Sequence, residues 1–157
     1  MIEADLEGQP GSTLPFQQAD LPLPGVMPGR IGDMLTWDES QFLLVVTTGT
    51  SLGAVGFRAE EHSAQPPTQA TGWEQCQEVS ARFEAGEVIL RDLDANQILL
   101  ADSLISCPGR YRIRLYATGR DSGVELQEAG DDLVERYLMQ LWPEDQERSA
   151  TPLRRLD

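Results

Sequence analysis

Residues 109–116 read GRYRIRLY, and from residue 110 to residue 115 arginines alternate strictly with large apolar residues. In an extended chain the tyrosine, isoleucine and leucine side chains point to one side and the arginines point to the other. This period of two predicts a half-buried β-strand. Residues 134–142 read VERYLMQLW and place apolar side chains on one face in the same way, and Pro143 ends the stretch because proline has no N–H to donate. The two stretches are predicted to be the core-forming strands of an all-β domain.

Outward from this pair, short strands alternate with glycine and proline turns at intervals of about 8–12 residues. Residues 42–48 are apolar on both faces, which predicts a central strand, and residues 54–58 are predicted to pair with it. Residues 79–83 and 88–90 are predicted to form a hairpin. Short strands without a long helical stripe are typical of an antiparallel β-sandwich, here expected to be jelly-roll-like.

The chain is predicted to have three parts. Residues 1–32 carry Pro10, Pro15, Pro22, Pro24 and Pro28, and this density predicts an extended proline-rich arm that docks either on its own sheet or on a partner. Residues 33–145 form the predicted β-sandwich domain. Residues 146–157 are polar and are predicted to be a flexible C-terminal tail.

The composition limits the partners of the chain. Its 157 residues carry a formal net charge of −14, with a pI near 4.3, and every basic residue is arginine. Such a surface repels phosphates, which argues against direct binding to nucleic acid or to an anionic membrane and favours a basic partner. The acidic N-terminus lacks the basic and apolar regions of a secretory signal, so we expect a cytoplasmic protein.

The densest acidic stretch lies between the two core strands. Residues 119–135 hold six acidic side chains against Arg120 alone. The loop either meets a basic surface, where complementary charge speeds association, or is an ordinary solvated loop. Tyr137 and Trp142 would supply apolar anchors if they are exposed. The predicted partner-binding residues are therefore Asp121, Glu125, Glu128, Asp131, Asp132, Tyr137 and Trp142.

Three arginines share one face of the predicted strand over residues 109–116: Arg110, Arg112 and Arg114. Like charges on one face repel unless acids lie opposite them on neighbouring strands. Glu78, Glu84 and Glu87 are the candidate partners, so we expect cross-strand ion pairs here and not a phosphate site.

One stretch opens like a calcium loop, with Asp92, Asp94 and Asn96 in the order D-x-D-x-N. The match then fails, because Gln97 stands where the loop needs a glycine and Ser103 stands where it needs a bidentate glutamate. We expect a solvated turn and no metal site.

No set of residues predicts catalysis. His62 is the single histidine, and no G-x-S-x-G or similar element accompanies it. Cys76 and Cys107 are far apart and lack a C-x-x-C pair, and the sequence allows either a disulfide between them or two free thiols. The chain is predicted to have no catalytic, cofactor-binding or metal-binding residues.

The motifs G-x-Y-R-x-R at residues 109–114, G-R-D at 119–121 and Y-L-x-Q-x-W-P at 137–143 resemble those of a group of small uncharacterised bacterial β-sandwich proteins. That resemblance covers residues 42–143 and implies a domain type. The order of strands and the P-G-x-Y motif at residues 108–111 are more distantly similar to the ComJ-type inhibitors of a bacterial DNA-entry nuclease. This second resemblance implies an acidic inhibitor that covers a basic surface.

These observations lead to two expectations of function. The first is a non-enzymatic acidic binding protein that docks on a basic protein partner, for example as an inhibitor or immunity protein of a nuclease or toxin. The alternative is a structural or accessory module of a larger bacterial assembly, held by strand addition at an exposed sheet edge or by the arm.

Overall fold

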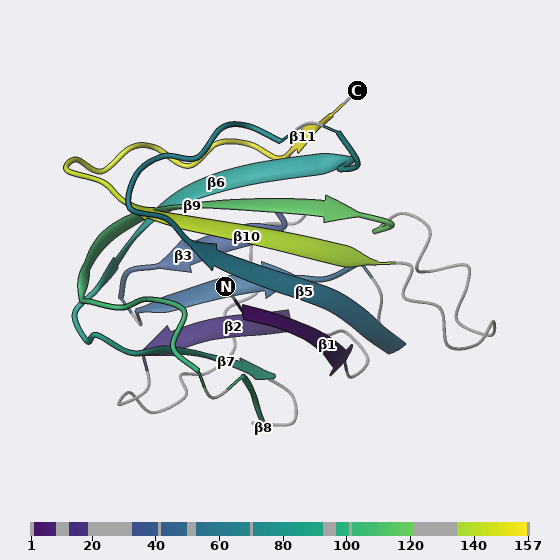
Figure 1. Cartoon of the computed structure of the whole chain (residues 1–157), viewed down its shortest axis with the longest axis horizontal. Helices are drawn as coiled ribbons and strands as arrows, with labels where there is room; N and C mark the ends of the chain where they lie inside the picture. Colours follow the sequence, from purple (N-terminus) through teal and green to yellow (C-terminus); the bar gives the residue numbers. More distant parts are fainter. Residues whose placement is uncertain are drawn as a thin grey trace.

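The structure is a computed structural model, and it describes residues 2–8, 13–18, 33–40, 42–49, 53–69, 71–92, 97–100, 102–120 and 135–156. For residues 2–8, 13–18, 53–54, 91–92 and 97–100 the backbone alone is described. All secondary structure in these ranges is β-strand, arranged in two sheets (Figure 1). No helix within them is long and apolar enough to cross a membrane.

The larger sheet has six strands in the order β1-β5-β10-β9-β6-β11. Along the chain these are β1 (Ile2–Gly8), β5 (Gly53–Glu61), β6 (Gln75–Phe83), β9 (Gly109–Thr118), β10 (Arg136–Pro143) and β11 (Arg154–Arg155). The predicted core pair is confirmed as β9 and β10, which run antiparallel with Met139 opposite Leu115. The sequence predicted an antiparallel sandwich. In the structure β10 is parallel to β5, so this sheet is mixed.

The smaller sheet has five strands in the order β3-β4-β2-β7-β8. They are β2 (Thr13–Gln18), β3 (Leu35–Asp38), β4 (Leu43–Thr47), β7 (Val88–Asp92) and β8 (Gln97–Leu100). The first four residues of β4 are buried, as expected for a strand of this composition. A tight connection through Phe42, whose φ is 50°, joins β3 to β4.

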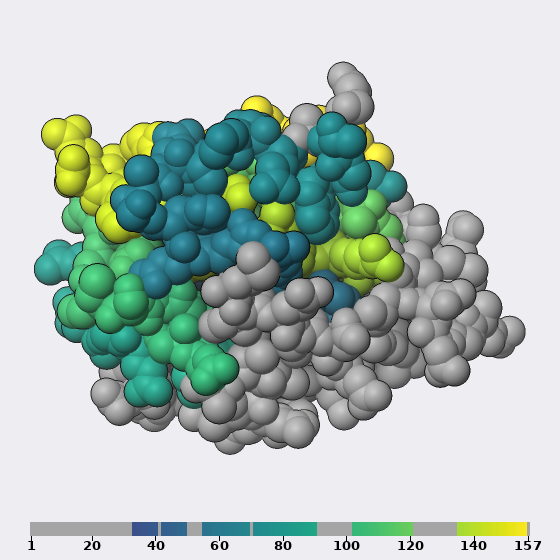
Figure 2. All heavy atoms as spheres, viewed as in Figure 1, coloured from purple at the N-terminus to yellow at the C-terminus, as the bar shows by residue number. Residues whose placement is uncertain are grey.

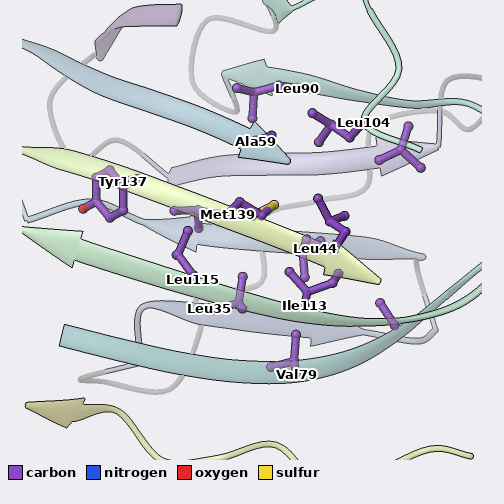
Figure 3. Close-up of a cluster of buried hydrophobic side chains, with 14 of the residues drawn as sticks. Leu35, Leu44, Ala59, Val79, Leu90, Leu104, Ile113, Leu115, Tyr137 and Met139 are labelled. Atoms are coloured by element: carbon purple, nitrogen blue, oxygen red, sulfur yellow. The ribbon is translucent and has the colours of Figure 1, made fainter. Parts of the chain in front are cut away.

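The hydrophobic core is made of side chains from both sheets. From the larger sheet Val79, Ile113 and Met139 point inward, and from the smaller sheet Leu35 and Leu44 meet them (Figure 3). All five are at most 3% exposed. The predicted inward face of β9 and β10 is confirmed, and burial of this aliphatic surface is the main source of stability.

Two predicted strand pairings are wrong. β5 does not pair with β4, because β4 belongs to the smaller sheet and β5 lies between β1 and β10 in the larger one. β7 does not pair with β6, because the chain crosses from one sheet to the other at residues 84–87. In both places the residues that predicted a turn connect strands of two different sheets, and not two neighbouring strands of one sheet.

Both ends of the chain contribute to the sheets. Within the predicted arm, β1 pairs with β5, and β2 lies between β4 and β7. The described parts of residues 1–32 are thus sheet strands, and a separate proline-rich arm is not confirmed. Residues 144–156, called here the C-terminal segment, run beside β6 and include β11, which pairs with it (Figure 1). This contact differs from the flexible tail expected from residue 146 onward.

Candidate ligand-binding groove

A groove of about 640 Å³ lies between β3, β6 and the C-terminal segment. Its volume is in the range of ordinary ligand sites. One wall is β3 with Asp33, the floor is β6, and the opposite wall is part of the C-terminal segment, whose yellow atoms lie at the surface along the upper edge of Figure 2. The groove is lined by Asp33, Leu35, Thr36, Trp37, Gln77, Val79, Ser80, Glu147, Arg148, Ser149, Ala150, Thr151 and Pro152.

Gln77 on the floor connects both walls. Its Oε1 accepts hydrogen bonds from the backbone N–H groups of Met34 and Leu35, at 2.8 and 3.0 Å. Its Nε2 donates to Asp33 Oδ1 at 3.0 Å and to the carbonyl of Thr151 at 3.3 Å. Because Gln77 is only 2% exposed, these bonds satisfy an amide that would be costly to bury alone. The side chain therefore fixes the spacing of the two walls.

Residues 148–151 are attached to β6 by further hydrogen bonds. The backbone of Glu78 donates to Thr151 Oγ1 at 2.8 Å, and the Thr151 N–H donates to the Glu78 carbonyl at 2.9 Å. Ser80 Oγ donates to the Arg148 carbonyl at 3.0 Å and accepts from the Arg148 N–H at 3.1 Å. Leu153 adds an apolar contact with the core. The wall formed by this segment is thus fixed in place before any ligand arrives.

Behind this wall lies a buried ionic cluster on the outer face of the larger sheet. Arg112 Nε and Arg114 Nε bind the two oxygens of Glu78, at 3.0 and 2.7 Å. Both arginine side chains are 3% exposed, and the Arg114 guanidinium lies 4.9 Å from the centre of the Trp142 ring. The predicted cross-strand pairing is confirmed for Arg112 and Arg114 with Glu78.

Backbone carbonyls complete this cluster. Arg112 Nη1 donates to the carbonyls of Arg148 and Ser149, and Arg114 Nη1 donates to the carbonyl of Pro66. Burial raises the pKa of Glu78, but the hydrogen bonds and charges of Arg114 and Arg112 outweigh it and leave that pKa below its ordinary value. The cluster fastens two covering segments to the sheet.

Trp37 marks one end of the groove. Its ring is edge-on to Phe83 at 5.3 Å and to Phe42 at 6.4 Å between centroids, so its position is fixed by packing. A smaller cleft shares Trp37, Ser80 and Glu147 with the groove and adds Glu39, Ala81, Arg82 and Arg110. The groove therefore offers a half-buried aromatic surface with charged groups of both signs around it.

One polar atom in the groove wall has no partner. Thr36 Oγ1 is buried and makes no hydrogen bond within the described part of the chain. A buried hydroxyl without a partner costs about 1–3 kcal/mol. Because side chains alternate along β3, this hydroxyl points to the face opposite Leu35 and Trp37 and is not offered to a ligand in the groove.

The polar and aromatic groups that line the groove are carboxylates, one guanidinium, one amide, hydroxyls and an indole ring. The lining residues include no histidine and no cysteine, and the hydroxyls of Ser80 and Thr151 are already engaged in holding the C-terminal segment. His62 lies elsewhere, with Nε2 3.0 Å from Glu60 Oε2. Across the described ranges no three His, Cys, Asp or Glu side chains are grouped to hold a metal ion.

The structure describes two of the seven predicted partner-binding residues, and neither lies at a surface. Asp121, Glu125, Glu128, Asp131 and Asp132 lie outside the described residues. Tyr137 and Trp142 are 1% and 2% exposed, so the condition of exposure on which their role depended is not met. The physical reason is that Tyr137 points into the core and Trp142 lies beneath Arg114.

Glu135, the last acid of the predicted loop, is buried in a second polar cluster. Its Oε1 accepts hydrogen bonds from Tyr137 Oη and from the N–H of Gly49. Burial and the nearby carboxylate together raise the pKa of Tyr137 well above its ordinary value. Because Gly49 belongs to the chain that leaves the smaller sheet and Tyr137 to the larger, this cluster links the sheets at one end.

The groove was not predicted from the sequence. Gln77 lies on the same face of β6 as Gln75, Val79, Ala81 and Phe83, and a polar residue next to this apolar series is the signal that could have indicated a special site. The residues of the other wall carry no such signal, because only the folded chain brings the C-terminal segment beside β3.

No protein-family model matches the chain, and no curated protein matches it. A solved structure named "Crocagin biosynthetic gene J" is similar in fold, with a TM-score of 0.54 and 18% sequence identity. The match covers 90% of this chain and 96% of that one. At this identity the similarity shows a shared fold over nearly the whole of both chains.

Proposed function

We propose that the chain is a non-enzymatic, acidic binding protein that docks on a basic protein partner, for example as an inhibitor or immunity protein of a nuclease or toxin. The cytoplasm is its proposed location. For the finer fold class we propose a jelly-roll-like β-sandwich, which is supported by two packed sheets with a shared core.

The observation that carries this proposal is the formal net charge of −14. Burial does not reduce this excess among the described residues, because Arg112 and Arg114 are balanced by two buried acids, Glu78 and Glu135. A surface of this kind attracts a basic partner and speeds its association at low salt.

The groove supplies a contact site for such a partner. It combines an aromatic residue, Trp37, with the carboxylates of Asp33 and Glu147 and the guanidinium of Arg148. Aromatic residues at the centre of a contact with polar groups around them are typical of binding surfaces.

The second candidate function is an accessory or structural module of a larger bacterial assembly. It is favoured by the position of β3, the last strand in the order of its sheet among the strands described. An edge of this kind is a general site for strand addition.

A capture experiment distinguishes the two. Tagged protein is immobilised, exposed to its native lysate and washed with rising salt, and the released proteins are identified by mass spectrometry. We expect one basic protein that elutes as salt rises. Salt-resistant partners, or self-association alone, would contradict the proposal and favour the assembly module.

A triple variant tests the predicted acidic loop in the same system. Neutralising Glu128, Asp131 and Asp132 is expected to slow association with the captured partner by about two- to tenfold and to flatten its salt dependence. Association rates measured by surface plasmon resonance at several salt concentrations give the answer. An unchanged rate would remove the loop from the interface.

A further inference from the structure

We propose that the groove binds an extended segment of the partner, rich in arginine or lysine, as an added strand along the edge of β3. This inference rests on the proposed function and deepens it, because it names the part of the partner that is bound and the backbone that binds it.

The register of β3 shows which of its backbone groups face the groove. In an antiparallel pair, hydrogen-bonded and non-hydrogen-bonded positions alternate. The Thr47 N–H donates to the Met34 carbonyl at 2.9 Å, and Thr36 pairs with Val45 two residues further on. The backbone groups of Leu35 and Trp37 are therefore turned away from β4, and both residues line the groove.

Gln77 already occupies one of these positions. Its Oε1 accepts from the Leu35 N–H at 3.0 Å, as the carbonyl of a neighbouring strand would. Trp37 is two residues further along the same edge, beyond the Gln77 contacts on this wall, which are with Asp33, Met34 and Leu35. The sheet edge is thus capped at one end by a side chain and offers its backbone at Trp37 to a ligand.

The net charge of −14 favours a basic segment over an acidic one. The exposed acids Glu39 and Glu147 share the cleft beside Trp37 with Arg82 and Arg110, and Asp33 and Arg148 line the groove. The three acids are the positions that a basic head group can occupy. An arginine or lysine can place its head group at these acids and its apolar stem on the Trp37 ring. Successive side chains of a strand point to opposite faces, so every second residue of the bound segment would point away from these acids.

The test uses a synthetic peptide of about ten alternating arginine and valine residues, long enough to span β3. Two comparison peptides are a fully N-methylated copy, which has no backbone donors, and a copy with glutamate in place of arginine. Binding to the full ¹⁵N-labelled chain is measured by calorimetry at about 0.05 M and 0.3 M salt. Amide hydrogen exchange is followed by NMR.

We expect the arginine peptide to bind at the lower salt and to slow exchange of the Trp37 amide by about tenfold or more. The Thr36 amide, which faces β4, is the internal control and keeps its rate. We expect N-methylation to weaken binding by about tenfold or more, since it removes the main-chain bonds. The glutamate peptide is expected not to bind.

Paired variants test the charge match. Glu39→Gln with Glu147→Gln is expected to weaken arginine-peptide binding by about threefold to tenfold at the lower salt. Glu87→Gln with Asp102→Asn changes the net charge equally at exposed positions outside the groove and is the matched control. Equal weakening by both pairs would overturn the assignment to the groove.

The remaining outcomes separate this inference from the proposed function. Salt-dependent binding with an unchanged Trp37 amide, or equal binding of the N-methylated peptide, would overturn strand addition and leave the acidic docking protein standing. Absence of arginine-peptide binding also overturns strand addition, and the capture experiment then tests the proposed function by itself.

Equal binding of the glutamate peptide would overturn both strand addition by a basic segment and the proposed function. Protection of Trp37 that grows with protein concentration without peptide would show that a second copy occupies the edge, which overturns the partner segment.

Discussion

Arg114 Nε lies 2.7 Å from Glu78 Oε1, on the outer face of the larger sheet and away from the hydrophobic core. The same carboxylate binds Arg112, and both guanidiniums also hold the carbonyls of segments that cover the sheet. One glutamate thus joins β6 to β9 and, through the two arginines, to the residues that form a wall of the groove.

Glu78→Gln tests the weight of this cluster. The change leaves two buried guanidiniums without a counter-charge, and breaking a buried ion pair in this way costs about 3–5 kcal/mol. We expect the free energy of unfolding, measured by urea denaturation, to fall by that order. Glu87→Gln, at an exposed site, is the control and is expected to change it by less than about 0.5 kcal/mol. Similar values for both variants would show that the cluster adds little.

The same cluster gives the protein an acid-sensitive stability. The arginines lower the pKa of Glu78 in the folded state below its ordinary value of 4.5. The ion pairs of Glu78 therefore contribute fully to stability above about pH 4.5, and this contribution is lost as the pH falls through the lowered pKa. We expect the difference in unfolding free energy between the wild type and Glu78→Gln to shrink below pH 4.5. A difference that stays constant down to about pH 2 would contradict this linkage.

Gly49→Ala tests the close contact between Gly49 and the backbone of Arg120. A Cβ at this position would lie 2.5 Å from the carbonyl oxygen of Arg120, a backbone atom that cannot turn aside. We expect a loss of about 1–3 kcal/mol in unfolding free energy, as for other overpacked sites. Gly56→Ala is the matched control, because the nearest atom there is 3.3 Å away on the flexible side chain of Arg136. A Gly49→Ala variant as stable as the control would disprove the close contact.

The two cysteines are expected to react differently. Cys76 is buried and Cys107 is exposed, and the two are free thiols in the structure. Burial raises the pKa of Cys76, which lowers its thiolate fraction further. A thiol reagent such as Ellman's should therefore label about one thiol per native chain and about two in denaturant. No labelling in denaturant without a reductant would reveal the disulfide that the sequence also allows.

Local sequence patterns were sufficient to predict the main strands and which of their faces point into the core. The alternation around Ile113 and Met139 placed the core face correctly, because period two reports directly which side chains share a side of a strand. The pairing of Arg112 and Arg114 with Glu78 also followed from local logic, since a row of like charges needs acids opposite it.

Strand partners and the groove could not be predicted in the same way. A turn between two strands looks alike whether the chain returns in one sheet or crosses to the other, so the partners of β5 and β7 were mistaken. The groove depends on residues far apart in the chain, such as Trp37 and Thr151, and no local pattern relates them. The burial of Tyr137 and Trp142 was also missed. The sequence of a strand does not show whether other segments of the chain cover both faces of its sheet.

The parallel pairing of β5 with β10 has a consequence for how the molecule assembles. It sets Gly56 beside Arg136, so the middle of the larger sheet joins segments separated by about half of the chain. Contacts of such long sequence separation require a large loop to close before they stabilise anything, and proteins dominated by them fold in milliseconds to seconds. We therefore expect slow folding, with the two halves of the sheet exposed as unpaired edges until β10 docks.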